Sequence, residues 1–181
     1  MASQDWQVRD RILELRSQWL TLIGERLQTD QGQLLEYWRV EKADSVIVLP
    51  LLNQQLIFAC PTYRPGMQTQ TLDFPGGRVA EEQSPSDAAT ATLKRELDID
   101  AQALMSLTPL NQQGWAINSS FSNQCLYGFI AELHPQTHLD RNYIGATYDV
   151  SRAGIQSLLG VLHCLQCRAI LLEWCSQQTS L

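Results

Sequence analysis

The sequence predicts an α+β fold in which a mixed β-sheet is sandwiched between helices. Between residues 34 and 74, apolar runs of strand length alternate with turn-forming residues, as in a series of antiparallel hairpins. At the start, middle and end of the chain, apolar residues recur at helical spacing. Hairpins combined with such helices are typical of α+β proteins.

Length and composition narrow the class of protein. The 181 residues suffice for one domain, and 44% hydrophobic with 18% charged residues is typical of a soluble globular protein. A net charge of -6 disfavours a nucleic-acid partner. The first residues lack the features of a secretion signal, and the apolar-rich stretch 155–172 is interrupted by polar residues. We therefore expect a single cytoplasmic domain over residues 1–181 without a membrane span.

The N-terminal half is predicted to contain one helix and several strands. An amphipathic helix within residues 1–22 is indicated by apolar residues at three- and four-residue spacing: Val8, Ile12, Leu15, Trp19 and Leu22. This helix packs either within the domain or across a dimer, and the pattern leaves both options open. The predicted strands cover residues 34–40, residues 45–52, part of residues 56–64, and residues 71–74.

The C-terminal half is predicted to contain two helices and two strands. Ser84, Pro85, Ser86 and Asp87 supply helix-starting residues for a helix over residues 86–97. Strands are expected at residues 104–110 and 125–133, on either side of a loop at 114–123. A polar stretch over residues 139–148 then precedes a long final helix at 151–175.

Five cysteines do not indicate a disulfide framework in a chain of this length. Cys164 and Cys167 form a C-x-x-C sequence after His163, inside the predicted final helix. We expect buried thiols there, since cysteine is a common core residue. A zinc or redox site is the alternative.

The residues between the fourth strand and the middle helix carry the chemistry. Pro75, Gly76 and Gly77 form a predicted tight turn, where glycine permits positive φ and close approach of a ligand. The stretch Phe74 to Ile99 resembles the Nudix box, G-x5-E-x7-R-E-U-x-E-E-x-G-U, in which U is a bulky aliphatic residue. With the first glycine at Gly77, the register holds without a gap and places aliphatic residues at Leu93 and Ile99.

The resemblance extends over about residues 20 to 175. The segment 34–52, followed by Tyr-Arg-Pro-Gly at 63–66 and Phe-Pro-Gly-Gly at 74–77, looks like the ADP-ribose pyrophosphatase branch of the Nudix superfamily. This implies a Nudix fold, a homodimer, and a site at which Mg²⁺ or Mn²⁺ assists hydrolysis of a nucleoside diphosphate derivative.

Most acids that the Nudix box requires are replaced in this chain. In the family, glutamates at i, i+3 and i+4 of the helix converge on the metal ions; here these positions are Thr92, Arg95 and Glu96. The first glutamate of the box is Gln83, and Gln124 stands where pyrophosphatases of this branch usually carry another. A guanidinium at the middle position opposes a cation. A neutral amide cannot act as a general base at neutral pH.

The sequence therefore predicts a catalytically impaired Nudix-fold protein that serves as a binding or assembly module for a nucleotide, another anion or a protein partner. No cofactor is expected. The alternative is an active hydrolase of ADP-ribose or a related compound, with Mg²⁺ or Mn²⁺ held by Glu96 and other acids. A transcription regulator is disfavoured, because no residues are left for a DNA-binding domain.

The candidate site residues follow from the same resemblance. Glu96 is the residual catalytic and metal-binding candidate. Arg64 either contacts a phosphate or pairs with Glu96, and Arg95 either clamps a phosphate or is solvated. Trp38 either stacks on a purine or packs in the core or at a subunit contact, and Trp115 is a weaker second aromatic candidate. The substrate-binding candidates are Trp38, Arg64, Gly76, Gly77 and Arg95.

Overall fold

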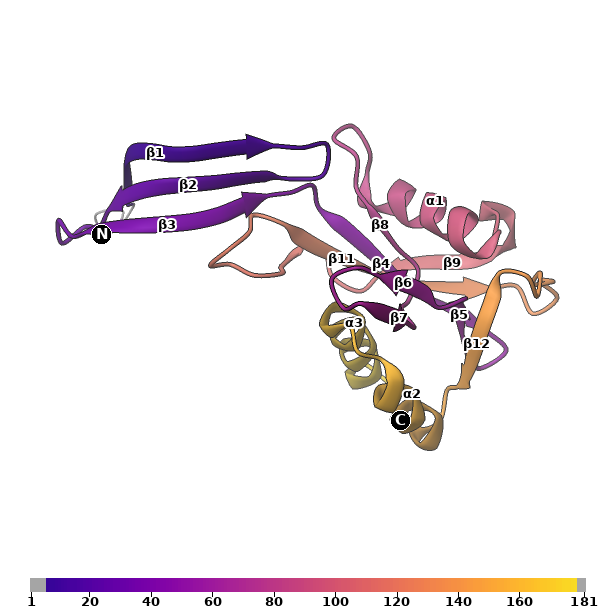
Figure 1. Ribbon diagram of the computed structural model, residues 1–181. Coiled ribbons are helices and arrows are strands. Elements are labelled where there is room, and N and C mark those ends of the chain that lie inside the picture. The colour runs from indigo at the N-terminus through magenta and orange to yellow at the C-terminus, as the bar shows by residue number, and fades with distance from the viewer. Residues whose placement is uncertain (1–5, 179–181) are drawn as a thin grey trace. The chain divides into compact units, whose positions relative to one another are not determined.

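The computed structural model describes residues 6–178 and divides the chain into two compact units. Unit 1 comprises the chain up to Ala43 together with Ala116–Cys125, and unit 2 comprises Asp44–Trp115 and the chain from Leu126 onward. The sequence predicts one domain, so this division is a feature that the pattern of residues did not indicate. Unit 1 is built on an antiparallel sheet and unit 2 on a mixed sheet with helices (Figure 1).

Unit 1 contains strands where the sequence predicted a helix. Its sheet has the order β1 (Gln7–Arg16), β2 (Thr21–Gln28) and β3 (Leu34–Glu41). The N-terminal helix prediction is therefore wrong, and its first five residues lie outside the described residues. The pairing of β1 with β2 shifts register between Val8 and Asp10 and between Arg11 and Leu13. Each shift interrupts the two-residue alternation of a strand, which is why the apolar spacing looked helical.

Unit 2 is organised around the neighbouring strands β11 (Cys125–Leu133), β4 (Ser45–Leu52), β5 (Gln55–Ala59) and β12 (Ile144–Asp149), in that order. β11 and β4 are parallel, whereas β4–β5 and β5–β12 are antiparallel. β8 (Gly76–Arg78) pairs with β4, and β9 (Leu104–Pro109) pairs with β11. Three further strands are short: β6 (Thr62–Arg64), β7 (Thr69–Thr71) and β10 (Trp115–Ala116).

Most predicted strands are confirmed, and the differences have local causes. The predicted strand at 71–74 is wrong in its bounds, because β7 ends at Thr71 and β8 begins only at Gly76. β12 begins within residues 139–148, which the sequence indicates only as a polar stretch and for which no strand is predicted. It pairs only with β5 along the main strand order and is half exposed, so it needs few apolar residues.

The helices are α1 (Pro85–Leu97), α2 (Arg152–Val161) and α3 (Leu165–Ser176), with a 3₁₀ turn, η1, at Ala101–Ala103. α1 begins as predicted, with the Ser84 hydroxyl accepting a hydrogen bond from the Asp87 N–H. The single final helix is wrong: the chain leaves helical geometry at Leu162, and Arg168 Nη1 donates to the carbonyls of Leu159 and Leu162 at 2.6 and 3.0 Å. None of the helices in the described part of the chain is long and apolar enough to cross a membrane.

Helices cover both faces of the unit 2 sheet (Figure 1). On one face, Val46 and Val48 of β4 share a buried cluster with Leu93 and Leu97 of α1. On the other face, Gly128 of β11 leaves room for Ile170 of α3, since a Cβ at Gly128 would lie 2.3 Å from the Ile170 Cδ1 atom. The predicted α+β class, a mixed sheet between helices, is confirmed.

Candidate functional site

The loop-helix stretch that resembles the Nudix box lies wholly in unit 2. β8 carries Gly76 and Gly77 beside β4, with Gly77 opposite Val46. A Cβ at Gly77 would lie 2.3 Å from Thr92 Oγ1 and 3.3 Å from Arg95 Nη2. Neither glycine has a positive φ, so close approach of β8 to α1, rather than unusual backbone geometry, requires glycine at position 77.

Arg95 joins the glycine strand to the remaining carboxylate of the helix. Its Nη2 donates to the Gly76 carbonyl at 2.9 Å and to Glu96 Oε1 at 2.8 Å. Glu96 Oε2 accepts from the Gly76 N–H at 3.3 Å. Both oxygens of Glu96 are therefore engaged, one with a cation that belongs to the protein itself.

The other replaced box positions have structural roles. Gln83 Oε1 accepts from the Ala80 N–H at 3.5 Å, which helps close the turn before α1. Thr92 is buried against Gly77. Asp98, at the second glycine position of the box, caps α1 with φ 54° and pairs with Lys94 at 2.6 Å. Glycine, which the box has at this position, adopts the left-handed conformation easily, and aspartate also tolerates it.

These donors do not fit a magnesium site. Mg²⁺ takes six oxygen ligands in near-octahedral geometry and is usually held by carboxylates together with phosphates. The helix positions that would converge on the ion hold a buried hydroxyl, a guanidinium and the paired Glu96. Arg95 itself stays 56% exposed in its side chain, so part of its guanidinium faces solvent and can meet an anion.

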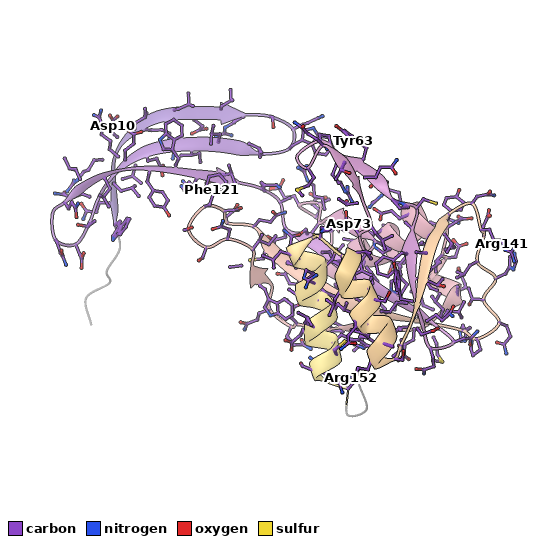
Figure 2. All side chains as sticks on the ribbon, turned by 60° about the horizontal axis from the view of Figure 1, so that its bottom comes forward. Asp10, Tyr63, Asp73, Phe121, Arg141 and Arg152 are labelled. Carbon is purple, nitrogen blue, oxygen red and sulfur yellow. The ribbon has the colours of Figure 1, made fainter. Side chains whose placement is uncertain are left out.

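Arg64, predicted to contact a phosphate or to pair with Glu96, pairs with Asp73 instead of Glu96. Its Nε and Nη2 donate to Asp73 Oδ2 at 3.0 and 2.9 Å, and the Thr71 hydroxyl donates to the same oxygen at 2.8 Å. The pairing with Glu96 is therefore wrong. Asp73 lies near the start of α3 (Figure 2). Arg64 thus orients Asp73, which the sequence analysis did not single out.

Asp73 forms a second cluster with the C-x-x-C cysteines. One carboxylate oxygen of Asp73 and the sulfurs of Cys164 and Cys167 all lie within 4.8 Å of one another. A hydrogen bond from the Cys167 thiol lowers the pKa of Cys164 to about 6, against the opposing effect of burial. The same interaction, with burial, raises the pKa of Cys167 well above its ordinary value.

Two predicted site positions, Trp38 and Gln124, belong to unit 1. The Trp38 ring covers Gly24 of β2, where a Cβ would meet it at 2.8 Å, and its Nε1 donates to Glu36 Oε1 at 2.8 Å. The ring is 39% exposed, so one side remains open for stacking or for a subunit contact. Gln124 stands where the resemblance predicts an acid. Its Nε2 donates to the Ala43 carbonyl at 2.9 Å, so the amide holds this loop in place.

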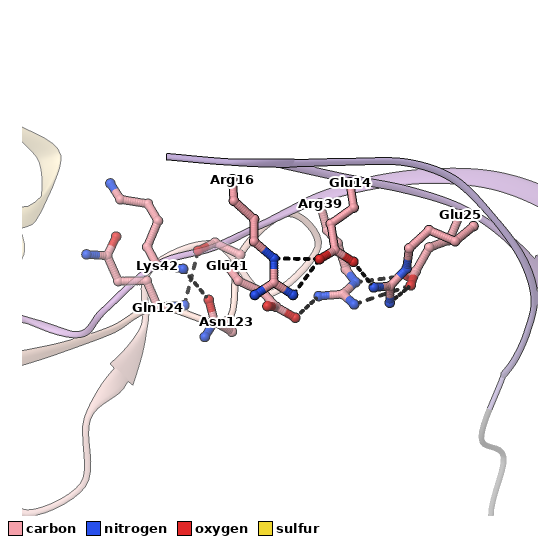
Figure 3. Close-up of polar contacts among 10 residues, drawn as sticks. Glu14, Arg16, Glu25, Arg39, Glu41, Lys42, Asn123 and Gln124 are labelled. Atoms are coloured by element: carbon pink, nitrogen blue, oxygen red, sulfur yellow. Dashed lines mark hydrogen bonds and ion pairs between the residues drawn. The ribbon is translucent and has the colours of Figure 1, made fainter. Parts of the chain in front are cut away.

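Unit 1 also holds a buried carboxylate that the sequence did not reveal (Figure 3). Glu25 is 1% exposed and accepts from Arg39 Nε at 3.0 Å and from Arg11 Nη2 at 2.8 Å. The hydrogen bond from Arg39, followed by that from Arg11, lowers the pKa of Glu25 although burial opposes this. Glu14 and Glu41 extend the network at its edges. With both oxygens satisfied, Glu25 is a structural group.

A separate pocket of about 480 Å³ lies elsewhere in unit 2. Its lining includes Leu51, Met105, Glu132 and Trp174. The described residues that line it include no arginine or lysine, and Glu132 carries a negative charge. The pocket is thus poorly suited to a phosphate.

Comparison with known proteins supports the fold. The chain matches the solved crystal structure of an ADP compounds hydrolase with a TM-score of 0.75 and 19% sequence identity, over 100% of both chains. No family model and no curated protein sequence matches it. The structural match confirms the α+β fold class and supports the Nudix fold; at this identity it establishes the fold alone.

Proposed function

We propose that this chain is a Nudix-fold protein that has lost pyrophosphatase activity and binds a nucleotide-type anion as a binding or assembly module. The observation that carries the proposal is the Arg95 guanidinium, bonded to both the Gly76 carbonyl and Glu96. It places a fixed positive charge where the family needs carboxylates around a metal ion. Gln83 and Thr92, which replace two more acids, take part in the turn and in core packing.

The remaining groups suit binding better than hydrolysis. In-line attack of water on a diphosphate requires charge neutralisation together with a base or a metal-bound water. Both oxygens of Glu96 are engaged, and Gln124 is an amide at a position where pyrophosphatases of the resembling branch usually carry a glutamate. The exposed part of Arg95 can still donate to a phosphate, with Gly76 and Gly77 allowing close approach of the ligand.

The direct test measures release of AMP from ADP-ribose in the presence of Mg²⁺ or Mn²⁺. We expect no turnover above the uncatalysed background. Turnover of about one per second that Glu96→Gln abolishes would overturn the proposal.

Binding is tested without metal, by thermal stabilisation with ADP-ribose in the presence of a chelator. We expect stabilisation of the wild-type chain, a loss in Arg95→Ala, and an unchanged response in Lys94→Ala. Lys94 is the matched control because it precedes Arg95 on α1 and pairs with Asp98 instead. Equal responses of the two variants would exclude Arg95 as the anion ligand.

An active hydrolase is the second candidate. It is favoured by the full-length structural match to an ADP compounds hydrolase and by the presence of Glu96. It predicts that ADP-ribose stabilises the chain only when Mg²⁺ or Mn²⁺ is present. The metal dependence of the thermal shift therefore separates the two candidates.

We also propose that the chain is a homodimer that uses the unit 1 sheet. Large apolar side chains on or beside β1 and β3 are exposed, including Leu15 at 60%, Trp19 at 62% and Leu34 at 62%. Association would remove this surface from water. Sedimentation analysis should give twice the chain mass, and Leu15→Glu with Leu34→Glu should give the monomer; a monomeric wild-type chain would contradict the proposal.

A further inference from the structure

We propose that Asp73, Cys164 and Cys167 form a zinc-binding site in unit 2. The three potential ligand atoms, one carboxylate oxygen and two sulfurs, lie within 4.8 Å of one another. In a tetrahedral zinc site, Zn–S bonds of about 2.3 Å and Zn–O bonds of about 2.0–2.2 Å place such ligands roughly 3.6–3.8 Å apart. A closing movement of about 1 Å or less would therefore complete the geometry.

The two carboxylate oxygens of Asp73 have different surroundings. Its Oδ2 accepts from Arg64 and from Thr71, whereas Oδ1 is buried and, among the described residues, has no hydrogen-bond partner. A buried carboxylate oxygen without a partner is costly, and a cation would satisfy it. Arg64 and Thr71 orient the carboxylate through hydrogen bonds to Oδ2, as residues that do not bind the metal themselves commonly do for metal ligands.

The break between α2 and α3 places the two cysteines. Cys164 is the N-cap residue of α3, and its side chain makes no capping hydrogen bond. Cys167 lies one turn later and is 1% exposed. The backbone N–H of Phe74 interacts with the Cys167 sulfur, so the segment that carries Asp73 also contacts the second thiol. The C-x-x-C spacing is that of a zinc ligand pair.

The ligand types select the metal. Thiolates bind Zn²⁺ well, whereas Mg²⁺ and Ca²⁺ prefer oxygen ligands alone. Both cysteines bind Zn²⁺ as thiolates, any remaining thiol proton passes to the solvent, and water takes the fourth position. The ion would join the segment before β8 to the start of α3. This site is separate from Arg95 and Glu96 and does not depend on the proposed loss of hydrolysis.

The test uses the full reduced chain and Co²⁺ as a spectroscopic substitute for Zn²⁺. We expect one Co²⁺ per chain, tetrahedral ligand-field bands with thiolate charge-transfer absorption, and displacement by Zn²⁺. Cys164→Ser should weaken Co²⁺ binding at least about 100-fold and Asp73→Asn about 10- to 100-fold. Cys175→Ser, which removes another cysteine of α3, should leave binding unchanged.

Thermal unfolding provides a second readout for variants of lower stability. Zn²⁺ at about 100 times its Kd should raise the melting temperature of the wild-type chain by about 5–10 °C, with no shift in Cys164→Ser. The proposal is overturned if the reduced chain binds no Co²⁺, or if Cys164→Ser binds it as the wild type does. A Cys164–Cys167 disulfide after mild oxidation, without metal binding by the reduced chain, would identify a redox pair instead.

Discussion

Glu96 on α1 and Asp73 before β8 are two carboxylates of unit 2 that each pair with an arginine. They lie close along one segment, because Glu96 contacts Gly76, three residues after Asp73. Glu96 binds Arg95 through one oxygen and the Gly76 N–H through the other. Arg64 and Thr71 both donate to one oxygen of Asp73, whereas the other oxygen is buried and has no hydrogen-bond partner among the described residues. A carboxylate is therefore closed to further ligands when protein donors engage both of its oxygens, and keeps one oxygen for a ligand when they engage only one.

The largest expected effect comes from forcing β8 away from α1. Gly77→Ala places a Cβ against Thr92 Oγ1 and should lower the free energy of unfolding by about 2–3 kcal/mol. Chemical denaturation measures this. In a Thr92→Ala background the cost should fall below about 1 kcal/mol, because the nearest obstructing atom is gone.

Gly76→Ala is the matched control, since its Cβ would lie 3.5 Å from the nearest atom, the Val46 carbonyl oxygen. A cost at Gly76 equal to that at Gly77 would show that backbone flexibility, rather than close packing, makes glycine necessary in β8.

Neutralising the two carboxylates should have unequal effects. With chelator present, Asp73→Asn should cost about 2 kcal/mol and Glu96→Gln about 1 kcal/mol. The Asp73 side chain is 14% exposed and that of Glu96 is 30% exposed, so solvent screens the Glu96 ion pair more. Urea denaturation at neutral pH measures both values. Equal losses would remove the proposed difference between the two carboxylates.

Replacing Arg95 should make Glu96 available to a metal ion. Arg95→Glu removes the cation that holds Glu96 and adds a carboxylate beside it, so Mn²⁺ should bind about tenfold tighter than to the wild type. Electron paramagnetic resonance of free Mn²⁺ measures this. Lys94→Glu changes the net charge equally on the same helix, and an equal gain there would attribute the effect to general charge.

Glu25 is a carboxylate closed by two arginines, and its contribution to stability should depend on pH. Its folded pKa lies below the ordinary value of 4.5, so its contribution to stability is present above that value and is lost as pH falls through the folded pKa. Glu25→Gln should cost about 1–2 kcal/mol at neutral pH, and the difference from wild type should shrink below pH 4.5. Denaturation curves at several pH values measure it; a constant difference would contradict the assigned role.

The sequence by itself determined the class of fold, the central strands and α1, whereas the register of the box stays a prediction. Apolar alternation, capping residues and glycine spacing are local signals, and they were sufficient for these elements. The left-handed Asp98 supports that register, because it occupies the place of the second box glycine. The sequence also indicated that Gln83, Thr92 and Arg95 depart from a metal-binding pattern.

Only the tertiary structure decided which groups meet. The residues of β1 have helical apolar spacing but form a strand with two register shifts. The predicted final helix is interrupted where Arg168 donates to the carbonyls of Leu159 and Leu162, and Cys164 lies at the start of α3. Asp73 stands 91 positions before Cys164 in the chain, and no local pattern connects the two. Contacts over such separations depend on how the sheet and helices pack, and the order of residues along the chain does not record this.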